Sequence, residues 1–119
     1  MRSDRDLLIS AYAHFNARDI DSVLDTMHND VDWPNGMEGG RVHGHSGVRE
    51  YWTRQWSLID PHVEPLSFNA GEGGRTVVEV HQVVRDLAGN VLVDQVVKHV
   101  YLIQDGLIRG MEIRDGASG

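Results

Sequence analysis

Three ionisable residues in the last third of the chain, Lys98, Asp94 and Asp115, offer the most direct chemistry. They stand in valine-rich stretches whose alternation places them on one face with apolar side chains. A lysine in a semi-apolar pocket can lose its proton and act as a base, or stay charged and hold an anion. A neighbouring aspartate can then transfer protons. The alternative is a structural ion pair at the pocket rim.

A second group of candidates is the pair His43 and His45, which lies in a stretch with five glycines between residues 35 and 47. A metal ion would need at least one more ligand in a fixed geometry. The nearby candidates for that ligand are His28, Asp32 and Glu38. A glycine-rich loop does not hold such a geometry, so no metal is expected. We predict instead that His43 is a hydrogen-bonding group at the mouth of a pocket.

Aromatic side chains and one methionine are predicted to form the wall of that pocket, because small-molecule sites are mostly apolar with few polar groups. The residues are Tyr12, Phe15, Trp33, Met37 and Trp52. Trp52 and Trp56 lie four residues apart on one predicted helix, so both are also candidates for the core. We assign Trp33 to the pocket, because it adjoins the glycine-rich loop, and Trp56 to the core.

Periodicity and turn residues predict the elements that position these side chains. Helical spacing of apolar residues predicts helices over 3–17, after Asp19, and over about 46–59. Alternation predicts strands over 31–33, 62–70, 75–85, 91–103 and 107–115. The order ααβαββββ is typical of an α+β domain whose helices pack on one face of a curved, mainly antiparallel sheet. One such domain accounts for residues 1–119, with 116–119 as a tail.

Tight turns at 86–90 and 105–106 set an expected register for the last three strands. With Arg85 paired to Val91 and no irregularity further along, one face is more apolar and is predicted to meet the helices. The site residues predicted on that face are Gln82, Asp94, Lys98, Val100, Met111, Ile113 and Asp115. The other face mixes valines with His99 and other polar groups, and is predicted to be a homodimer interface. A half-exposed sheet face is the alternative.

Composition excludes several classes of function. A net charge of −7 with scattered Lys and Arg argues against binding to nucleic acid and to anionic membranes. Cysteine is absent, which excludes disulfides and thiol chemistry. No phosphate-binding loop follows a strand, so no nucleotide or other cofactor is expected. The N-terminus has no apolar signal region and no stretch is long enough to span a bilayer, so a cytoplasmic protein is expected.

Four stretches, read in order, resemble the NTF2-like superfamily and its SnoaL-like branch. They are NARD at 16–19, DVDWP at 30–34, HGHSGVREYW at 43–52 and HVYLIQDGLIRGMEI at 99–113. The resemblance covers nearly the whole chain. It implies a cone, in which a strongly bent sheet wraps around helices and encloses a pocket. It also implies a dimer formed through the outer face of the sheet.

The superfamily includes ketosteroid isomerases, polyketide cyclases, epoxide hydrolases and dehydratases, so the resemblance alone does not assign a reaction. The isomerases place an oxyanion-binding tyrosine, a basic aspartate and a protonated acid at positions that hold Ala11, Trp33 and Lys98 here. Isomerase chemistry by that set is therefore not expected. The cyclases use one acidic residue in the pocket, for which Asp115 and Asp94 are the candidates. The hydrolases use an Asp-Arg-Asp set that this face does not provide.

Two hypotheses follow from the residues and the resemblance. In the first, the protein is a cofactor-independent lyase, cyclase or isomerase that acts on a hydrophobic, carbonyl-bearing compound. In the second, the same pocket only binds a small molecule and no reaction occurs. A third hypothesis is a protein-interaction module whose pocket has collapsed around Trp33. The sequence leaves open whether the protein is an enzyme.

Overall fold

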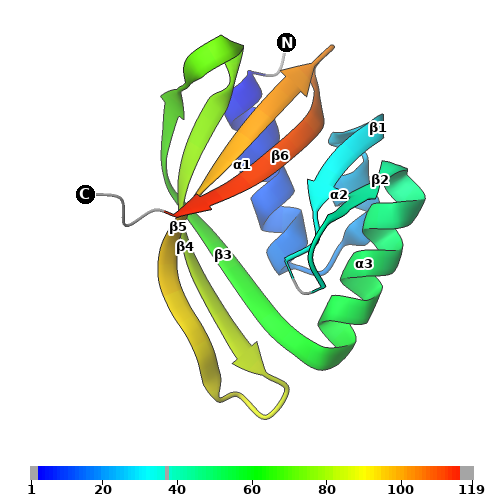
Figure 1. Cartoon of the computed structure of the whole chain (residues 1–119), viewed down its shortest axis with the longest axis vertical. Coiled ribbons are helices and arrows are strands. Elements are labelled where there is room, and N and C mark those ends of the chain that lie inside the picture. The colour runs from blue at the N-terminus through cyan, green and yellow to red at the C-terminus, as the bar shows by residue number, and fades with distance from the viewer. Residues whose placement is uncertain (1–2, 37, 116–119) are drawn as a thin grey trace.

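The computed structural model describes residues 3–36 and 38–115, and Figure 1 shows its arrangement. The helices are α1 (Asp4–Asn16), α2 (Ile20–Leu24) and α3 (Gly44–Leu58), with a short 3-10 turn η1 (Glu72–Gly74). The strands are β1 (Met27–Pro34), β2 (Arg41–His43), β3 (Ile59–Ala70), β4 (Thr76–Asp86), β5 (Val91–Gln104) and β6 (Leu107–Asp115). Strand β2 lies in the stretch predicted to be a loop, and β3 begins three residues earlier than predicted.

The strands form one sheet in the order β2-β1-β6-β5-β4-β3. Neighbours are antiparallel except β1 and β6, which are parallel. The long strands bend strongly, and the helices lie on the inner side of the curve (Figure 1). This arrangement confirms the predicted α+β cone. No helix in the described part of the chain is long and apolar enough to cross a bilayer.

Helix α1 forms where the sequence predicts it, because Ser3 caps it and its apolar residues share one face. The Ser3 Oγ accepts a hydrogen bond from the Asp6 N–H at 3.1 Å. The face that the helix buries is made of Leu7, Leu8, Ala11 and Tyr12. Helix α3 begins two residues before the predicted cap, at Gly44, where a φ of +75° favours glycine.

Side chains near the end of α1 form hydrogen bonds to strand β3. One of them, Asn16, bonds to both backbone groups of Val63, as a residue on a neighbouring strand would. Asn16 donates from Nδ2 to the Val63 carbonyl at 2.7 Å and accepts from the Val63 N–H at 3.0 Å. Arg18 donates to the Asp60 carboxylate and to the Pro61 carbonyl. These contacts fix the angle of α1 across the sheet, so that Tyr12 and Phe15 face the interior of the cone.

The register between β4 and β5 differs from the predicted one because of a β-bulge. Arg85 pairs with Val91 as expected, but the next pair is Val84 with Val93. Leu92 is therefore an extra residue on β5. An extra residue shifts every following residue of that strand to the opposite face of the sheet.

A second bulge lies at the other end of β5, in its pairing with β6. Leu102 pairs with Gly110 and Ile103 with Ile108, which leaves Arg109 as the extra residue on β6. Beyond that point Tyr101 lies opposite Met111, whereas a regular hairpin would place Val100 there.

Together the two bulges exchange the two faces of β5 relative to its neighbours β4 and β6. The faces predicted for residues 78–84 of β4 and for Met111 and Ile113 of β6 agree with the structure, whereas the face predicted for residues 91–103 is wrong. His99 and Tyr101 therefore point into the cone, and Lys98 and Asp94 belong to its outer face.

Candidate functional site

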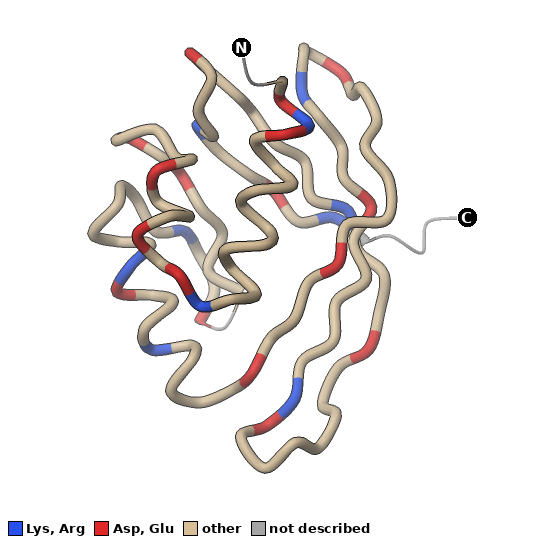
Figure 2. Tube along the Cα trace, turned by 180° about the vertical axis from the view of Figure 1, so that it is seen from behind, with Lys and Arg blue, Asp and Glu red and all other residues tan. Residues whose placement is uncertain are grey.

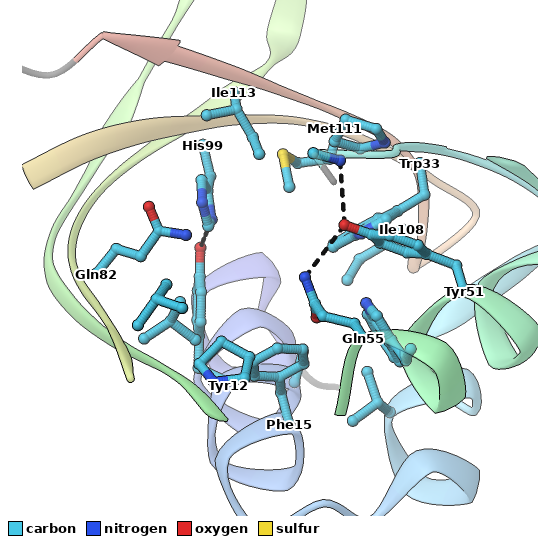
Figure 3. A pocket seen from close by; sticks show the side chains of 18 of the residues that line it. Tyr12, Phe15, Trp33, Tyr51, Gln55, Gln82, His99, Ile108, Met111 and Ile113 are labelled. Carbon is cyan, nitrogen blue, oxygen red and sulfur yellow. Dashed lines mark hydrogen bonds between the residues drawn. The ribbon is translucent and has the colours of Figure 1, made fainter. Parts of the chain in front are cut away.

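The interior of the cone holds a cavity of about 420 Å³ between the helices and the sheet. That volume is within the usual range for small-molecule sites. Its walls come from helices α1, α2 and α3, from β1 and from strands β3 to β6, and Figure 3 shows side chains that point into it. The cavity is open, so it is not collapsed around Trp33. Its more exposed lining residues include Val93 and Ile113, which mark the mouth.

No Asp, Glu, Lys or Arg is among the described residues that line this cavity. Figure 2 shows the charged residues spread over the chain instead of gathered on one element. The polar lining residues are Tyr12, Tyr51, Gln55, Gln82, Gln95, His99 and Tyr101. The described residues also contain no group of three or more His, Asp or Glu side chains that could hold a metal ion. The site therefore works with neutral hydrogen-bonding groups.

A chain of three side chains forms the polar end of the cavity at the sheet. The Tyr101 hydroxyl donates to the Tyr12 hydroxyl at 2.8 Å, and Tyr12 Oη lies 2.8 Å from His99 Nδ1. A contact of this length allows either tautomer of the neutral imidazole. Where Tyr12 donates to Nδ1, the imidazole carries its proton on Nε2, an atom with no hydrogen-bond partner among the described residues.

Burial keeps all three groups of this chain uncharged at neutral pH. Desolvation lowers the pKa of His99 from 6.5 to about 4. Desolvation, with a smaller contribution from the neighbouring Tyr101, raises the pKa of Tyr12 well above its ordinary value. The pKa of Tyr101 is also raised by burial, although its hydrogen bond with Tyr12 lowers it slightly. His99 is thus a neutral imidazole, and the two tyrosines are neutral phenols.

A second polar group faces the cavity from helix α3. The Tyr51 hydroxyl accepts hydrogen bonds from the Gly36 N–H and from Gln55 Nε2, both at 3.1 Å. The other amide atom of Gln55, Oε1, is buried and has no hydrogen-bond partner among the described residues. Figure 3 shows Gln55 and His99 entering the cavity from different walls.

Aromatic rings form the apolar wall between these two polar ends. Trp33 packs edge-on against Trp52 with ring centroids 5.7 Å apart, and it also lies 6.3 Å from Tyr101. Phe15 packs edge-on against both Trp52 and Trp56. Trp56 does not line the cavity and packs against the core, which agrees with the role assigned to it from the sequence.

Most residues predicted to contact a ligand lie in the cavity wall. They are Tyr12, Phe15, Trp33, Trp52, Gln82, Met111 and Ile113. Val100 does not, because the turned strand β5 directs it to the outer face. His43 does not either: its side chain is 69% exposed and lies 3.9 Å from the Asp30 carboxylate. Met37 lies outside the described residues.

The predicted set of Lys98, Asp94 and Asp115 is not brought together in the cavity. Lys98 lies between Glu79 and Arg114 on the outer face. Asp94 is exposed and bonds to His81 Nε2 at 2.7 Å, also on that face. Asp115 ends β6 opposite Val97, and its side chain lies outside the described part of the chain. The physical reason for the change is the reversal of β5 by its two bulges.

Five polar lining residues were missed from the sequence: His99, Tyr101, Gln95, Tyr51 and Gln55. The first three were assigned to the outer face by the regular register. A signal for His99 and Tyr101 was available, because an aromatic and a histidine on one face of a long strand are easier to bury than a lysine and an aspartate. Tyr51 and Gln55 lie one turn apart on α3, but nothing in the sequence shows that their polar atoms meet.

The cone and its neutral, mostly apolar cavity define a class of small-molecule-pocket proteins. This chain belongs to the SnoaL-like family, because the model of the SnoaL-like domain matches residues 9–111. No curated protein matches the chain. The family membership agrees with the resemblance seen in the sequence.

Solved structures share the fold of this chain. TerC, co-crystallised with polyporic acid, is 30% identical with a TM-score of 0.80, over 92% of this chain and 88% of TerC. An NTF2-like protein of unknown function from Burkholderia pseudomallei is 26% identical with a TM-score of 0.82, over 97% and 92% of the two chains. RV0760c from Mycobacterium tuberculosis, in complex with estradiol-17beta-hemisuccinate, has 16% identity and a TM-score of 0.80 over 94% and 93%.

Proposed function

We propose that this protein is a cofactor-independent enzyme of lyase, cyclase or isomerase type that acts on a hydrophobic, carbonyl-bearing molecule. The supporting observation is the hydrogen-bonded chain from Tyr101 through Tyr12 to His99. We take the neutral imidazole as the tautomer that carries its proton on Nε2, which leaves this N–H group to a ligand in the apolar cavity. Such a donor binds a carbonyl oxygen and stabilises the negative charge that develops there.

The three reaction types share the step that this geometry supports. With its oxygen bound to His99 Nε2–H, the carbonyl is polarised and the adjacent C–H becomes more acidic. The proton passes to water at the cavity mouth, since no carboxylate is among the described lining residues. Return of that proton to another carbon gives an isomerase. Attack of the enolate carbon on a second carbonyl, whose new alkoxide takes the proton back, gives a cyclase. Loss of a β-hydroxyl, which leaves as water with the proton, gives a lyase.

The apolar wall supports a ring-shaped ligand. Trp33, Trp52 and Phe15 present ring surfaces to the cavity, and flat ligands bind such surfaces with little loss of conformational entropy. TerC and RV0760c were each crystallised with a small molecule, which is consistent with a ligand in the corresponding cavity here. We infer a hydrophobic small molecule as the natural partner.

A second candidate function is non-catalytic binding of the same kind of molecule. The observation in its favour is the absence of any acidic or basic side chain among the described residues of the lining, apart from the neutral His99. Here His99 and Gln55 would orient the ligand and no bond would change.

A panel of neutral hydrophobic ketones in D2O separates the two functions. We expect at least one member of the panel to raise the melting temperature of the protein. We also expect the protein to catalyse deuterium incorporation next to the carbonyl of that ketone, or its conversion to product, as measured by mass spectrometry. Thermal stabilisation without deuterium incorporation or product across all ligands that bind would contradict the enzyme and support the binding protein.

We also propose that the protein is a homodimer formed through the outer face of the sheet. The bulges change the membership of that face, which now carries Val77, Val83, Val96 and Leu102 among charged residues. Val96 and Leu102 are each 37% exposed. Charged neighbours of both signs, such as Lys98 beside Glu79, suit a self-complementary contact.

Sedimentation at micromolar concentration is expected to give twice the mass of one chain. Val96→Glu should shift the protein toward the monomer, because it places a charge in the centre of the proposed contact. The matched control is Leu87→Glu, which puts the same charge on an exposed side chain at the tip of the β4–β5 hairpin. A wild-type protein that sediments as a monomer would exclude the dimer.

A further inference from the structure

The carboxamide of Gln55 has an unused hydrogen-bonding atom inside the cavity. Gln55 lies on the inward side of helix α3, one turn after Tyr51, and its side chain reaches the cavity across from the sheet (Figure 3). Its Oε1 atom is buried and has no hydrogen-bond partner among the described residues. A buried acceptor without a donor is rare in folded proteins, because it has lost its hydrogen bond to water.

In the structure the nitrogen of this amide faces the Tyr51 hydroxyl. The Gly36 N–H donates to that hydroxyl oxygen at 3.1 Å. Gln55 Nε2 donates to the same oxygen, also at 3.1 Å. The amide nitrogen is therefore engaged with the protein, and the amide oxygen is left for a hydrogen-bond donor from outside the chain.

The chemistry of the whole cavity limits what that donor can be. Among the described lining residues there is no carboxylate to hold an ammonium group and no Lys or Arg to hold a carboxylate. A charged ligand would therefore lose its hydration without gaining a counter-ion. Neutral O–H and N–H groups remain as donors to an amide oxygen in an aromatic pocket, and a hydroxyl on a flat ring is the simplest of them.

We propose that Gln55 is a specificity-determining residue that binds a hydroxyl group of the ligand, opposite the carbonyl group held by His99. The ligand class is a neutral, flat ring compound with a hydroxyl at one end and a carbonyl at the other. This inference rests on the proposed function for the role of His99, but the hydroxyl contact itself is measured by binding alone. The cavity of about 420 Å³ accommodates a compound of two fused rings with both substituents.

Two probes that differ only in the donor test this assignment. They are 2-acetyl-6-hydroxynaphthalene and its methyl ether, 2-acetyl-6-methoxynaphthalene, titrated calorimetrically. The wild type is expected to bind the hydroxyl compound about tenfold more tightly, because the ether cannot donate to Gln55 Oε1. Gln55→Leu should bring the two affinities together, mainly by weakening the hydroxyl compound about tenfold.

The matched variant is Gln82→Leu, which removes an amide of the same size from another wall. The Oε1 of Gln82 already accepts from Gln95 Nε2 at 3.1 Å, so its loss should change both affinities together and keep their ratio. Equal affinities in the wild type, an unchanged ratio in Gln55→Leu, or no binding of either probe would overturn the proposal. One combined result is a ratio of the two affinities that changes as expected in Gln55→Leu while His99→Leu retains turnover. That result would support the hydroxyl site and contradict the proposed role of His99 in the reaction.

Discussion

Replacement of His99 by leucine is expected to lower turnover by about 100- to 1000-fold, the usual effect of removing one donor to a developing oxyanion. The ketone would keep its aromatic wall but lose the Nε2–H group. The change should therefore appear mainly in kcat, with a smaller effect on KM. The measurement is the initial rate of deuterium incorporation or product formation for a ketone that the wild type converts.

The matched variant His99→Gln distinguishes a hydrogen-bond donor from a proton acceptor. A glutamine can accept the Tyr12 proton through its oxygen and still present an N–H to the cavity, but it cannot take up a proton. We expect it to recover part of the rate lost in the leucine variant. If both variants were equally inactive, His99 would act as a base or an acid. If both were fully active, His99 would have no role in the reaction.

Folding of the leucine variant needs its own measurement, because leucine removes the acceptor of the Tyr12 hydroxyl. A buried donor left without a partner costs about 1–3 kcal/mol. A cooperative thermal transition and an unchanged far-UV spectrum would show that the variant is folded. Loss of turnover in a folded variant is then assigned to His99 itself.

The order of elements could be predicted from the sequence, because it depends on local signals. Ser3 caps α1, and the Asp105-Gly106 turn sets the start of the last hairpin, as their residue types indicate. Strand β2 was missed because it has only three residues within a glycine-rich stretch. It pairs with the preceding strand β1 between nearby residues, such as Pro34 with Arg41, but three residues are too few to show an alternation.

The site was predicted less completely because the bulges carry no clear sequence signal. Leu92 and Arg109 are ordinary strand residues, yet each adds one position and together they exchange the two faces of β5. Lys98 and His99 are adjacent, so a shift of one residue replaced the predicted lysine by the histidine that the structure places in the cavity. Tyr12 and Trp33 lie on other elements and kept their predicted places.

The free energy of unfolding is expected to fall by about 3 kcal/mol between pH 7 and pH 4 through His99 alone. Its pKa is about 4 in the folded protein, against 6.5 for an exposed histidine. As the pH falls below 6.5, the unfolded chain takes up a proton at this position and the folded chain does not. The unfolded state is thus favoured progressively, until the folded protein also becomes protonated near pH 4.

Urea unfolding at pH 7, 5.5 and 4.5 measures this effect as the difference between the wild type and His99→Gln. Other groups, including Asp19 and Glu38 with their lowered pKa values, titrate alike in both proteins and cancel in the difference. We expect the wild type to lose stability more steeply than the variant, since glutamine does not titrate. Parallel curves would mean that His99 is protonated as easily in the folded protein as in the unfolded chain. The neutral imidazole that the proposed reaction requires would then not persist below pH 6.5, and the hydrogen bond from Tyr12 to Nδ1 would be replaced by one that His99 donates.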